Sequence, residues 1–495
     1  MKLKRSDIKT TGLQPEKINA LLGALMTPQY GMQAMMLLKN GAVVKEVYKK
    51  PYQKNTRRCM FSVTKTLTAL AIGFLMQDGS ISEEDLVMPF FKEQLPAAPM
   101  EYMQHLKIKH LLTMTSGVNA AQQDTARAHV DAVKIGFPYM YADFKINEQM
   151  NWAQDFLETY LTYPPGEKFV YDNNASHLLS AIVGKVTQKT MADYLAEKLF
   201  APLGIPAPLW QTAPEGVTVG GYGVWLTLEE LAGIGQFLLQ KGHWQGKQIL
   251  EKAYVEKMTS AQVEIGNRAA KWEKAFGYQV WILGEGQAYA GIGAFGQMYV
   301  VFPAQEMVFA MLGGSLHYMK VLDVLMRHIP NLEQQEGMAE TKKLPKHWAE
   351  EIPAGASSWD MPQAMPLSNH TFSFSENLYG IEEMSFACGT EDTLRIKIKG
   401  EESIVPIGFG YWAEGKFPVQ EDAETDVHHT PLFSAVAVSG AWAQDLFHIA
   451  VVFYETPYRM DLYCRFTPHG IKIEVKRNVS FVAAYETTLY GVRED

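Results

Sequence analysis

The chain has 495 residues, of which 47% are hydrophobic and 20% are charged, a balance typical of a folded protein with a sizeable core. Its formal net charge of -9 gives no electrostatic reason to expect nucleic acid, because phosphate binding needs clustered Lys and Arg. The three cysteines, Cys59, Cys388 and Cys464, lack C-x-x-C spacing, so neither a disulfide framework nor a zinc knot is indicated.

The N-terminus, "MKLKRSDIKTTG", is basic, but it is not followed by the apolar segment typical of a signal peptide. No window of the sequence approaches the roughly 18 uninterrupted apolar residues of a membrane-spanning helix. We therefore expect a protein without a membrane span and, if Met1 is the native start, a cytoplasmic location.

The first half of the chain predicts a hairpin followed by helices. Two apolar runs flank Lys39-Asn40-Gly41, which is the turn chemistry of a β-hairpin. The stretch "FSVTKTLTALAIGFL", residues 61–75, predicts an apolar helix directly after it. From about 105 to 270 the pattern is mainly helical, including a helix that opens at a threonine cap, Thr227. We expect a sheet that is interrupted by a helical insertion at about residues 80–270.

Strands return in the second half of the chain. Residues 275–286 predict strand structure, and residues 295–314 predict two strands joined at Pro303-Ala304-Gln305-Glu306. Residues 316–329 predict an amphipathic helix. The polar, Pro-punctuated residues that follow predict a domain boundary between 331 and 369. We therefore predict a first domain over 1–335, a linker over 336–368 and a β-rich domain over 369–495, either a small antiparallel barrel or a sandwich.

The first motif that could carry chemistry is Ser62 and Lys65 at the start of the apolar helix. Residues three apart lie on the same helix face, so hydroxyl and amine would be neighbours at the end where backbone N–H groups lack partners. The spacing alone is weak, because Ser6 and Lys9 repeat it in a polar stretch. Ser62 differs because it follows a hairpin and opens an apolar helix. In the alternative interpretation, Ser62 caps the helix and Lys65 is solvated.

The second motif is Tyr171-Asp172-Asn173, the one Y-x-N in the chain, which lies between a Pro-Pro-Gly turn and a helix. A tyrosine and an asparagine two apart in an extended loop project to one side. They would place a phenol near the nucleophile and an amide that donates to a substrate carbonyl. In the alternative interpretation, Tyr171 is a packed aromatic residue and Asn173 caps the following helix.

Several motifs in the same order carry a resemblance to a known family. The hairpin, the Ser-x-x-Lys helix, "HLLTMTSGV", the Y-x-N segment, "GGYGVWLTLEELAGIGQFLLQKG" and a glycine-rich final strand resemble the serine β-lactamase and penicillin-binding-protein superfamily. The nearest branch contains class C-type β-lactamases, D-alanyl peptidases and related esterases. The resemblance covers roughly residues 15–330 and implies an α+β fold, an antiparallel sheet flanked by helices with a helical insertion.

The resemblance also implies roles for individual residues. The nucleophilic serine of the family falls on Ser62, its helix lysine on Lys65, and its tyrosine and asparagine on Tyr171 and Asn173. A carbonyl substrate would acylate Ser62 and the acyl-enzyme would then be hydrolysed. A lysine acts as the base only where burial or a neighbouring cation lowers its pKa. Whether Lys65 is the base and Tyr171 a proton shuttle is left open, as it is for related enzymes.

The third motif of the family departs from its pattern. It is usually Lys or His, then a small residue, then Gly, whereas "AYAGIGAFGQMYVVF" has neither base, and the basic position falls near Ala288, Tyr289 or Ala290. That cation normally helps to hold an anionic carboxylate, so we expect neutral esters and amides as substrates ahead of D-Ala-D-Ala peptides and β-lactams. Gly291 and Gly293 would let a substrate approach the strand backbone, although such glycines also serve as plain turn residues.

The sequence therefore predicts a serine hydrolase that acts through an acyl-enzyme on a small ester, amide or short peptide. No metal or organic cofactor is implied, no nucleic-acid partner is expected, and oligomerisation is left open. His105, His110 and His177 are expected to be structural. The opposing hypothesis is a catalytically silent binding or sensor protein with the same fold. The missing cation supports it, and the retention of Ser62 with Lys65 and Tyr171 opposes it.

Overall fold

The computed structural model describes residues 1–95, 101–119, 151–266, 271–333, 370–377, 379–387, 392–418, 433–479 and 486–494. The chain divides into two compact units. Among the described residues, the first unit contains 1–47, 57–95, 101–119, 151–266 and 271–333. The second contains 48–56 and the described residues from 370 onward. The domain limits at 335/336 and 368/369, like Cys388, lie outside the described residues, so those limits stay predictions.

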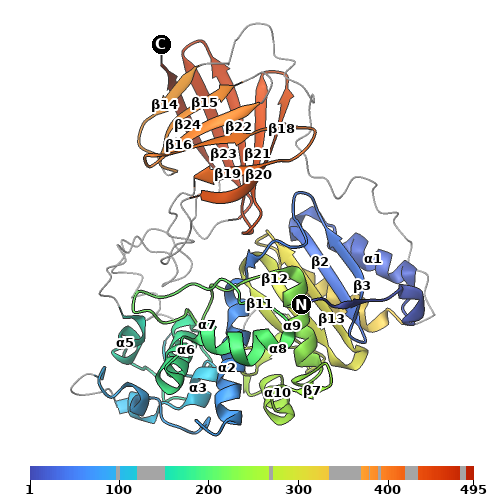
Figure 1. The fold of residues 1–495 in the computed structure, drawn as a ribbon, viewed down its shortest axis with the longest axis vertical. Coiled ribbons are helices and arrows are strands. Elements are labelled where there is room, and N and C mark those ends of the chain that lie inside the picture. Colours follow the sequence, from blue (N-terminus) through green and yellow to red (C-terminus); the bar gives the residue numbers. More distant parts are fainter. Residues whose placement is uncertain are drawn as a thin grey trace. The chain divides into compact units, whose positions relative to one another are not determined.

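The first unit is built on a nine-stranded sheet with the order β1-β3-β2-β13-β12-β11-β10-β9-β8 (Figure 1). All pairings from β2 through β13 to β8 are antiparallel, as expected from the sequence. Strand β1, which was not expected, pairs with β3 in parallel, so the complete sheet is mixed. The strands are β1 Lys4–Arg5, β2 Met32–Lys39, β3 Ala42–Tyr48, β8 Val263–Glu264, β9 Glu273–Phe276, β10 Trp281–Leu283, β11 Ala288–Gly293, β12 Gln297–Phe302 and β13 Met307–Gly313.

Both predicted turns of this sheet are confirmed. The β2–β3 hairpin turns at Asn40 (φ 51°) and Gly41 (φ 76°), because a two-residue turn that follows strand twist needs positive φ at both positions. The β12–β13 turn runs through Pro303–Gln305 and ends at Glu306, which is also left-handed with φ 49°.

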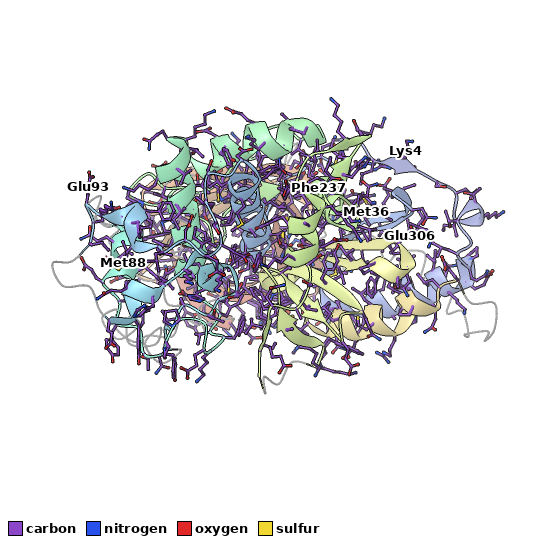
Figure 2. All side chains as sticks on the ribbon, turned by 90° about the horizontal axis from the view of Figure 1, so that it is seen from below. Lys4, Met36, Met88, Glu93, Phe237 and Glu306 are labelled. Carbon is purple, nitrogen blue, oxygen red and sulfur yellow. The ribbon has the colours of Figure 1, made fainter. Side chains whose placement is uncertain are left out.

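Helices flank the sheet and form a separate group beside it (Figure 1). Helix α1 packs against α11, and α9 packs against β2, β12 and β13, although it lies within the range predicted as a helical insertion. Phe237 of α9 and Met36 of β2 are fully buried, and both are labelled in Figure 2. The helices are α1 Pro15–Leu25, α2 Thr64–Gln77, α3 Ile108–Leu112, α5 Trp152–Leu157, α6 Asn173–Thr187, α7 Met191–Leu195, α8 Ala201–Leu203, α9 Leu228–Leu239, α10 Lys252–Met258 and α11 Lys320–His328.

Helix α2 is the central helix of the first unit. It packs against α6, α7 and α10 and against strand β11, and every residue from Thr64 to Leu75 is buried. A helix that is covered on all sides must be apolar all round, which explains why its sequence lacks a polar stripe. A charged residue on such a helix is buried as well.

The second unit is an 11-stranded, nearly closed barrel, so the expectation of a barrel or sandwich resolves to a barrel (Figure 1). The order is β17-β16-β15-β14-β24-β23-β22-β21-β20-β18, and β19 also pairs with β20. Ser403 of β17 donates to the Lys416 carbonyl of β19 at 2.6 Å, which brings the two ends together. The strands are β14 Thr371–Phe374, β15 Ile381–Ala387, β16 Thr393–Ile398, β17 Glu401–Pro406, β18 Gly408–Phe409, β19 Ala413–Pro418, β20 Phe433–Ala443, β21 Leu446–Phe453, β22 Arg459–Thr467, β23 Gly470–Arg477 and β24 Glu486–Arg493.

The alternation predicted for β16 sets which side chains fill the barrel. Leu394, Ile396 and Ile398 are buried in its core, while Arg395 between them is exposed. Trp442 and Phe447 stack in the same core with ring centroids 4.8 Å apart. None of the helices in the described ranges combines the length and apolar character needed to cross a bilayer.

Candidate active site

Ser62 lies in a 3-10 turn, Phe61–Val63, directly before α2 begins at Thr64. The turn is anchored from the loop of residues 220–226, because the Met60 N–H donates to the Val224 carbonyl at 2.8 Å. A short pairing of Arg58–Cys59 (β4) with Trp225–Leu226 (β5) fixes the same two segments. In the described part of the chain, no backbone or side-chain group accepts a hydrogen bond from the Ser62 N–H.

The residue before Ser62 has an unusual backbone conformation. Phe61 has φ 48°, in the left-handed region that side chains other than glycine rarely adopt. Its ring packs edge-on against the ring of Phe295, with centroids 5.7 Å apart, and Phe295 is also left-handed with φ 62°. Two strained residues from distant segments therefore pack together beside the serine.

Lys65 is 2% exposed, and its Nζ makes three short polar contacts. They join it to Ser62 Oγ at 3.1 Å, to Asn173 Oδ1 at 2.6 Å and to the Gly221 carbonyl at 2.6 Å. Three acceptors match the three donors of an ammonium. In the neutral amine, two N–H groups occupy the 2.6 Å contacts and the lone pair is left for the Ser62 hydroxyl. The alternative of a solvated Lys65 is wrong, because the amine is enclosed.

Burial also changes the proton affinity of this amine. Desolvation lowers the pKa of Lys65 from 10.5 to about 7, and the charge of Asp172 partly opposes that shift. A substantial fraction of the amine is therefore neutral near pH 7, which is the state that a general base requires.

The aromatic ring of Tyr171 faces the Lys65 amine. Lys65 Nζ lies 4.8 Å from the ring centroid, and the ring stacks on Trp281 of β10 with centroids 5.6 Å apart and planes 9° apart. Among the described contacts, no hydrogen bond joins the Tyr171 hydroxyl to Ser62 or Lys65. The role of this phenol as a proton shuttle stays a prediction.

Asn173 is the first residue of α6, and Asp172 is the residue that caps the helix. The Asp172 Oδ1 accepts the Asn174 N–H at 2.9 Å, so the alternative in which Asn173 is the cap is wrong. Asn173 turns its oxygen to Lys65, and no described residue pairs with its amide nitrogen. That nitrogen can still donate to a substrate carbonyl. Helix α6 is tied to the connection between β9 and β10, because Ser176 Oγ donates to Gln279 Oε1 at 2.7 Å.

Gly293 allows β11 to lie directly against the segment that carries Ser62, and Gly291 leaves room for the Tyr299 side chain of the neighbouring strand β12. A Cβ on Gly293 would lie 2.2 Å from the Met60 carbonyl oxygen, and a Cβ on Gly291 would lie 2.3 Å from Tyr299 Cε1. The close approach that these glycines permit is to the protein's own atoms. Their use by a substrate stays a prediction.

The sequence and fold of this site match a known family. A model of the family described as Beta-lactamase matches residues 18–326. The chain belongs to the beta-lactamase family. Penicillin-binding protein 4* of Bacillus subtilis is 29% identical over 157 residues, a match that covers 32% of this chain and only 31% of that protein.

Two further similarities cover more of this beta-lactamase-family chain. The 6-aminohexanoate-dimer hydrolase of Paenarthrobacter ureafaciens is 23% identical over 285 residues, which covers 56% of this chain and 70% of that protein. A solved structure from Bacillus anthracis, considered a 6-aminohexanoate-dimer hydrolase, aligns with a TM-score of 0.54 and 22% identity over 68% of this chain and 88% of that chain.

Three parts of this beta-lactamase-family site were not predicted from the sequence. They are the Gly221 carbonyl that binds Lys65, the buried Asp172 carboxylate and the Trp281 ring behind Tyr171. The "GGYG" segment and the aspartate inside Y-x-N were visible signals for the first two. Two of the histidines expected to be structural have structural partners: His110 Nδ1 accepts the Lys107 N–H, and His177 Nε2 lies 2.8 Å from Glu215 Oε1. Within the described ranges, no group of three metal-ligating side chains converges.

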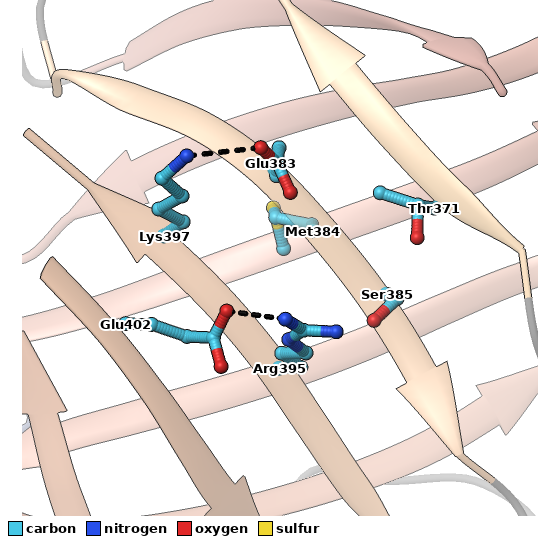
Figure 3. Close-up of a pocket in the computed structure, with 7 residues that line it drawn as sticks. All are labelled: Thr371, Glu383, Met384, Ser385, Arg395, Lys397 and Glu402. Atoms are coloured by element: carbon cyan, nitrogen blue, oxygen red, sulfur yellow. Dashed lines mark hydrogen bonds and ion pairs between the residues drawn. The ribbon is translucent and has the colours of Figure 1, made fainter. Parts of the chain in front are cut away.

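The barrel carries a separate shallow pocket on its outer surface (Figure 3). Two cross-strand ion pairs line it, Lys397 with Glu383 at 3.1 Å and Arg395 with Glu402. Charges that neutralise each other across neighbouring strands support strand pairing, and they do not resemble the arrangement around Ser62.

Proposed function

We propose that this protein is a serine hydrolase that forms an acyl-enzyme on Ser62 with small, neutral esters or amides. The observation that carries the proposal is the set of contacts at Lys65 Nζ. A buried amine whose two N–H groups are held by Asn173 and Gly221 can direct its lone pair only toward Ser62 Oγ. This arrangement suits a base for a serine nucleophile.

In the first step, Lys65 takes the Ser62 proton while Oγ attacks the substrate carbonyl. The bond to the alcohol or amine then breaks, and the leaving group takes a proton from Lys65, directly or through the Tyr171 hydroxyl. In the second step, water gives a proton to Lys65 and attacks the acyl carbonyl. The bond to Ser62 Oγ then breaks, Oγ takes the proton from Lys65, and the acid is released. Asn173 can orient the substrate through its amide N–H.

The negative charge on the carbonyl oxygen needs two N–H donors. The Ser62 N–H is the first candidate, since no described group occupies it. The second candidate lies on β11, because its pairing with β10 ends at Trp281 and Ala290. Strand β11 therefore extends past its neighbour at Gly291 and Gly293, beside the Ser62 turn.

Two observations support neutral substrates. Strand β11 offers the buried side chains of Ala288, Tyr289 and Ala290 where the family usually has a cation. The wall beside Lys65 is aromatic, formed by Tyr171 and Trp281. One relative is named as a hydrolase of a 6-aminohexanoate dimer, which fits a small-molecule substrate.

The test is covalent labelling of the whole chain with a fluorophosphonate and an activated acyl ester, followed by intact mass spectrometry. We expect one adduct on the wild type and none on Ser62→Ala. Ser6→Ala is the matched control, because Ser6 and Lys9 repeat the spacing at the exposed N-terminus. Labelling that survives in Ser62→Ala would contradict the proposal by placing the reactive nucleophile elsewhere. No labelling of the wild type would also contradict it and would favour the silent binding protein.

The ring behind Tyr171 should also affect acylation. Trp281→Ala removes the surface on which Tyr171 stacks, so we expect acylation by an activated ester to slow by roughly 10- to 100-fold through misplacement of the Tyr171 ring. Trp281→Phe should recover most of the rate. Trp272→Phe is the control, because Trp272 instead donates to Asp323. Equal rates for Trp281→Ala and wild type would show that the stack does not position Tyr171.

A further inference from the structure

Asp172 is a buried carboxylate with an incomplete set of partners. It is 2% exposed, and Oδ1 accepts the Asn174 N–H as the cap of α6. The Ala175 N–H also favours the charged carboxylate, but no described group makes a regular hydrogen bond to Oδ2. A buried charge without full hydrogen bonding is costly unless an opposite charge lies nearby. A helix cap needs only one oxygen, and Ser, Thr or Asn provides it equally well. Capping alone therefore does not account for an aspartate at this position.

The opposite charge is Lys65. The two chain neighbours of Asp172 both touch that amine, Asn173 through Oδ1 at 2.6 Å and Tyr171 through its ring face. The electrostatic interaction is mutual, because Asp172 favours the charged amine and Lys65 favours the charged carboxylate. The middle residue of Y-x-N thus places a negative charge beside the base.

The charged groups around α2 other than Asp172 are occupied elsewhere: Asp78 pairs with Lys198, and Glu83 pairs with Lys257. The buried charge of Arg58 acts on the Cys59 thiol. The remaining thiol and phenols are uncharged where Lys65 titrates. Burial raises the pKa of Cys59 to about 12 and raises the pKa of three tyrosines above the usual value: Tyr222, Tyr254 and Tyr299. Farther along α6, His177 and Glu215 pair with each other. Burial raises the pKa of Asp172 to about 6, so it is largely ionised at pH 7. Among the described residues, Asp172 is the charged group whose field acts on Lys65.

We propose that Asp172 is a positioning residue whose buried carboxylate sets the charge state of the Lys65 amine, and thereby the pH above which Ser62 is acylated. The inference rests on the proposed function, because it assigns Lys65 as the base. The negative charge holds the proton on Lys65 to a higher pH than burial alone would allow. Removal of the Asp172 charge should therefore lower the pH at which Ser62 begins to be acylated.

The experiment compares the pH dependence of fluorophosphonate labelling in the wild type and in Asp172→Asn, which keeps the shape and the cap. The wild-type rate should rise with a midpoint near pH 7, and the variant midpoint should fall by about one pH unit, since an opposite charge at close range shifts a pKa by one to three units. At pH 6 the rate, as a fraction of its plateau, should rise from about one tenth to about one half. Asp172→Ser, also a good cap, should shift the midpoint in the same direction.

Asp7→Asn is the matched control, because Asp7 is an exposed cap whose Oδ1 accepts the Lys9 N–H at 3.0 Å. A second measurement follows the Lys65 ¹³Cε resonance with pH in lysine-labelled protein, assigned by its loss in Lys65→Met. A lower rate with an unchanged midpoint and an unchanged Lys65 titration would mean that Asp172 is only a cap, and would overturn the inference. If the wild type is not labelled but Lys65 titrates lower in Asp172→Asn, the proposed hydrolase fails while the electrostatic coupling stands.

Discussion

Replacing Lys65 by methionine is expected to slow the acylation of Ser62 by roughly 10²- to 10⁴-fold, the usual contribution of a general base. Methionine fills a similar volume on a fully packed helix, so the fold should be retained. The loss arises because the Ser62 hydroxyl keeps no described neighbour that can accept its proton. Stopped-flow labelling with a fluorogenic activated ester measures the rate, and circular dichroism checks the fold.

The pH dependence distinguishes a neutral base from an electrostatic role of the amine. Burial lowers the pKa of Lys65 to about 7, so a base must lose its proton first and the wild-type rate should rise through pH 7. Lys65→Met should lose that rise. A rate that falls above pH 7 would instead indicate that the ammonium is the active form. Lys39→Met is the matched control, since Lys39 is also buried but binds Gln305 and Glu333.

Gly293→Ala is expected to lower the stability of the first unit by about 1–3 kcal/mol, which is the range for overpacking a close-packed site. The backbone conformation is not the obstacle, because Gly293 has φ -108°, which alanine adopts freely. The obstacle is the Met60 carbonyl oxygen, 2.2 Å from the position that the new Cβ would take. Either β11 or the turn that carries Ser62 must move, so acylation should fall together with stability.

Urea unfolding and the labelling rate measure the two effects of Gly293→Ala. Gly23→Ala in α1 is the control, because its Cβ would meet nothing within 4 Å and alanine is a better helix former by about 0.5–1 kcal/mol. Wild-type stability and rate in Gly293→Ala would show that β11 can shift away from Met60 without affecting Ser62.

The parts of the fold that local chemistry determines were predictable from the sequence. Asn40-Gly41 specifies a hairpin turn through its φ angles. Thr227 caps α9 because its side chain accepts the Glu230 N–H, while the Glu230 side chain accepts the Thr227 N–H. The parallel partner of β3 was not predictable. Strand β1 is only two residues long, and its place depends on tertiary packing, including the ion pair of Arg5 with Glu229.

Some features of the candidate site could also be predicted from the sequence, and others could not. The proximity of Ser62 and Lys65 follows from their spacing around a helix start, and the burial of Lys65 follows from the apolar sequence of α2. The orientation of Tyr171, with its ring face to the amine, could not be predicted, since it depends on Trp281 from a strand more than a hundred residues away. Backbone acceptors such as the Gly221 carbonyl leave no signature of their own in a sequence.

The pair of left-handed phenylalanines has a consequence for how the chain acquires its final shape. Such residues cost of order 1–3 kcal/mol each and persist only where the surrounding structure over-determines them. Phe61 and Phe295 are separated by more than two hundred residues, so the geometry around the nucleophile depends on a contact of very high sequence separation. Such contacts form late, after loop closure. A ribosome-bound nascent chain that ends before Phe295 should therefore carry Ser62 without the conformation that prepares it to react.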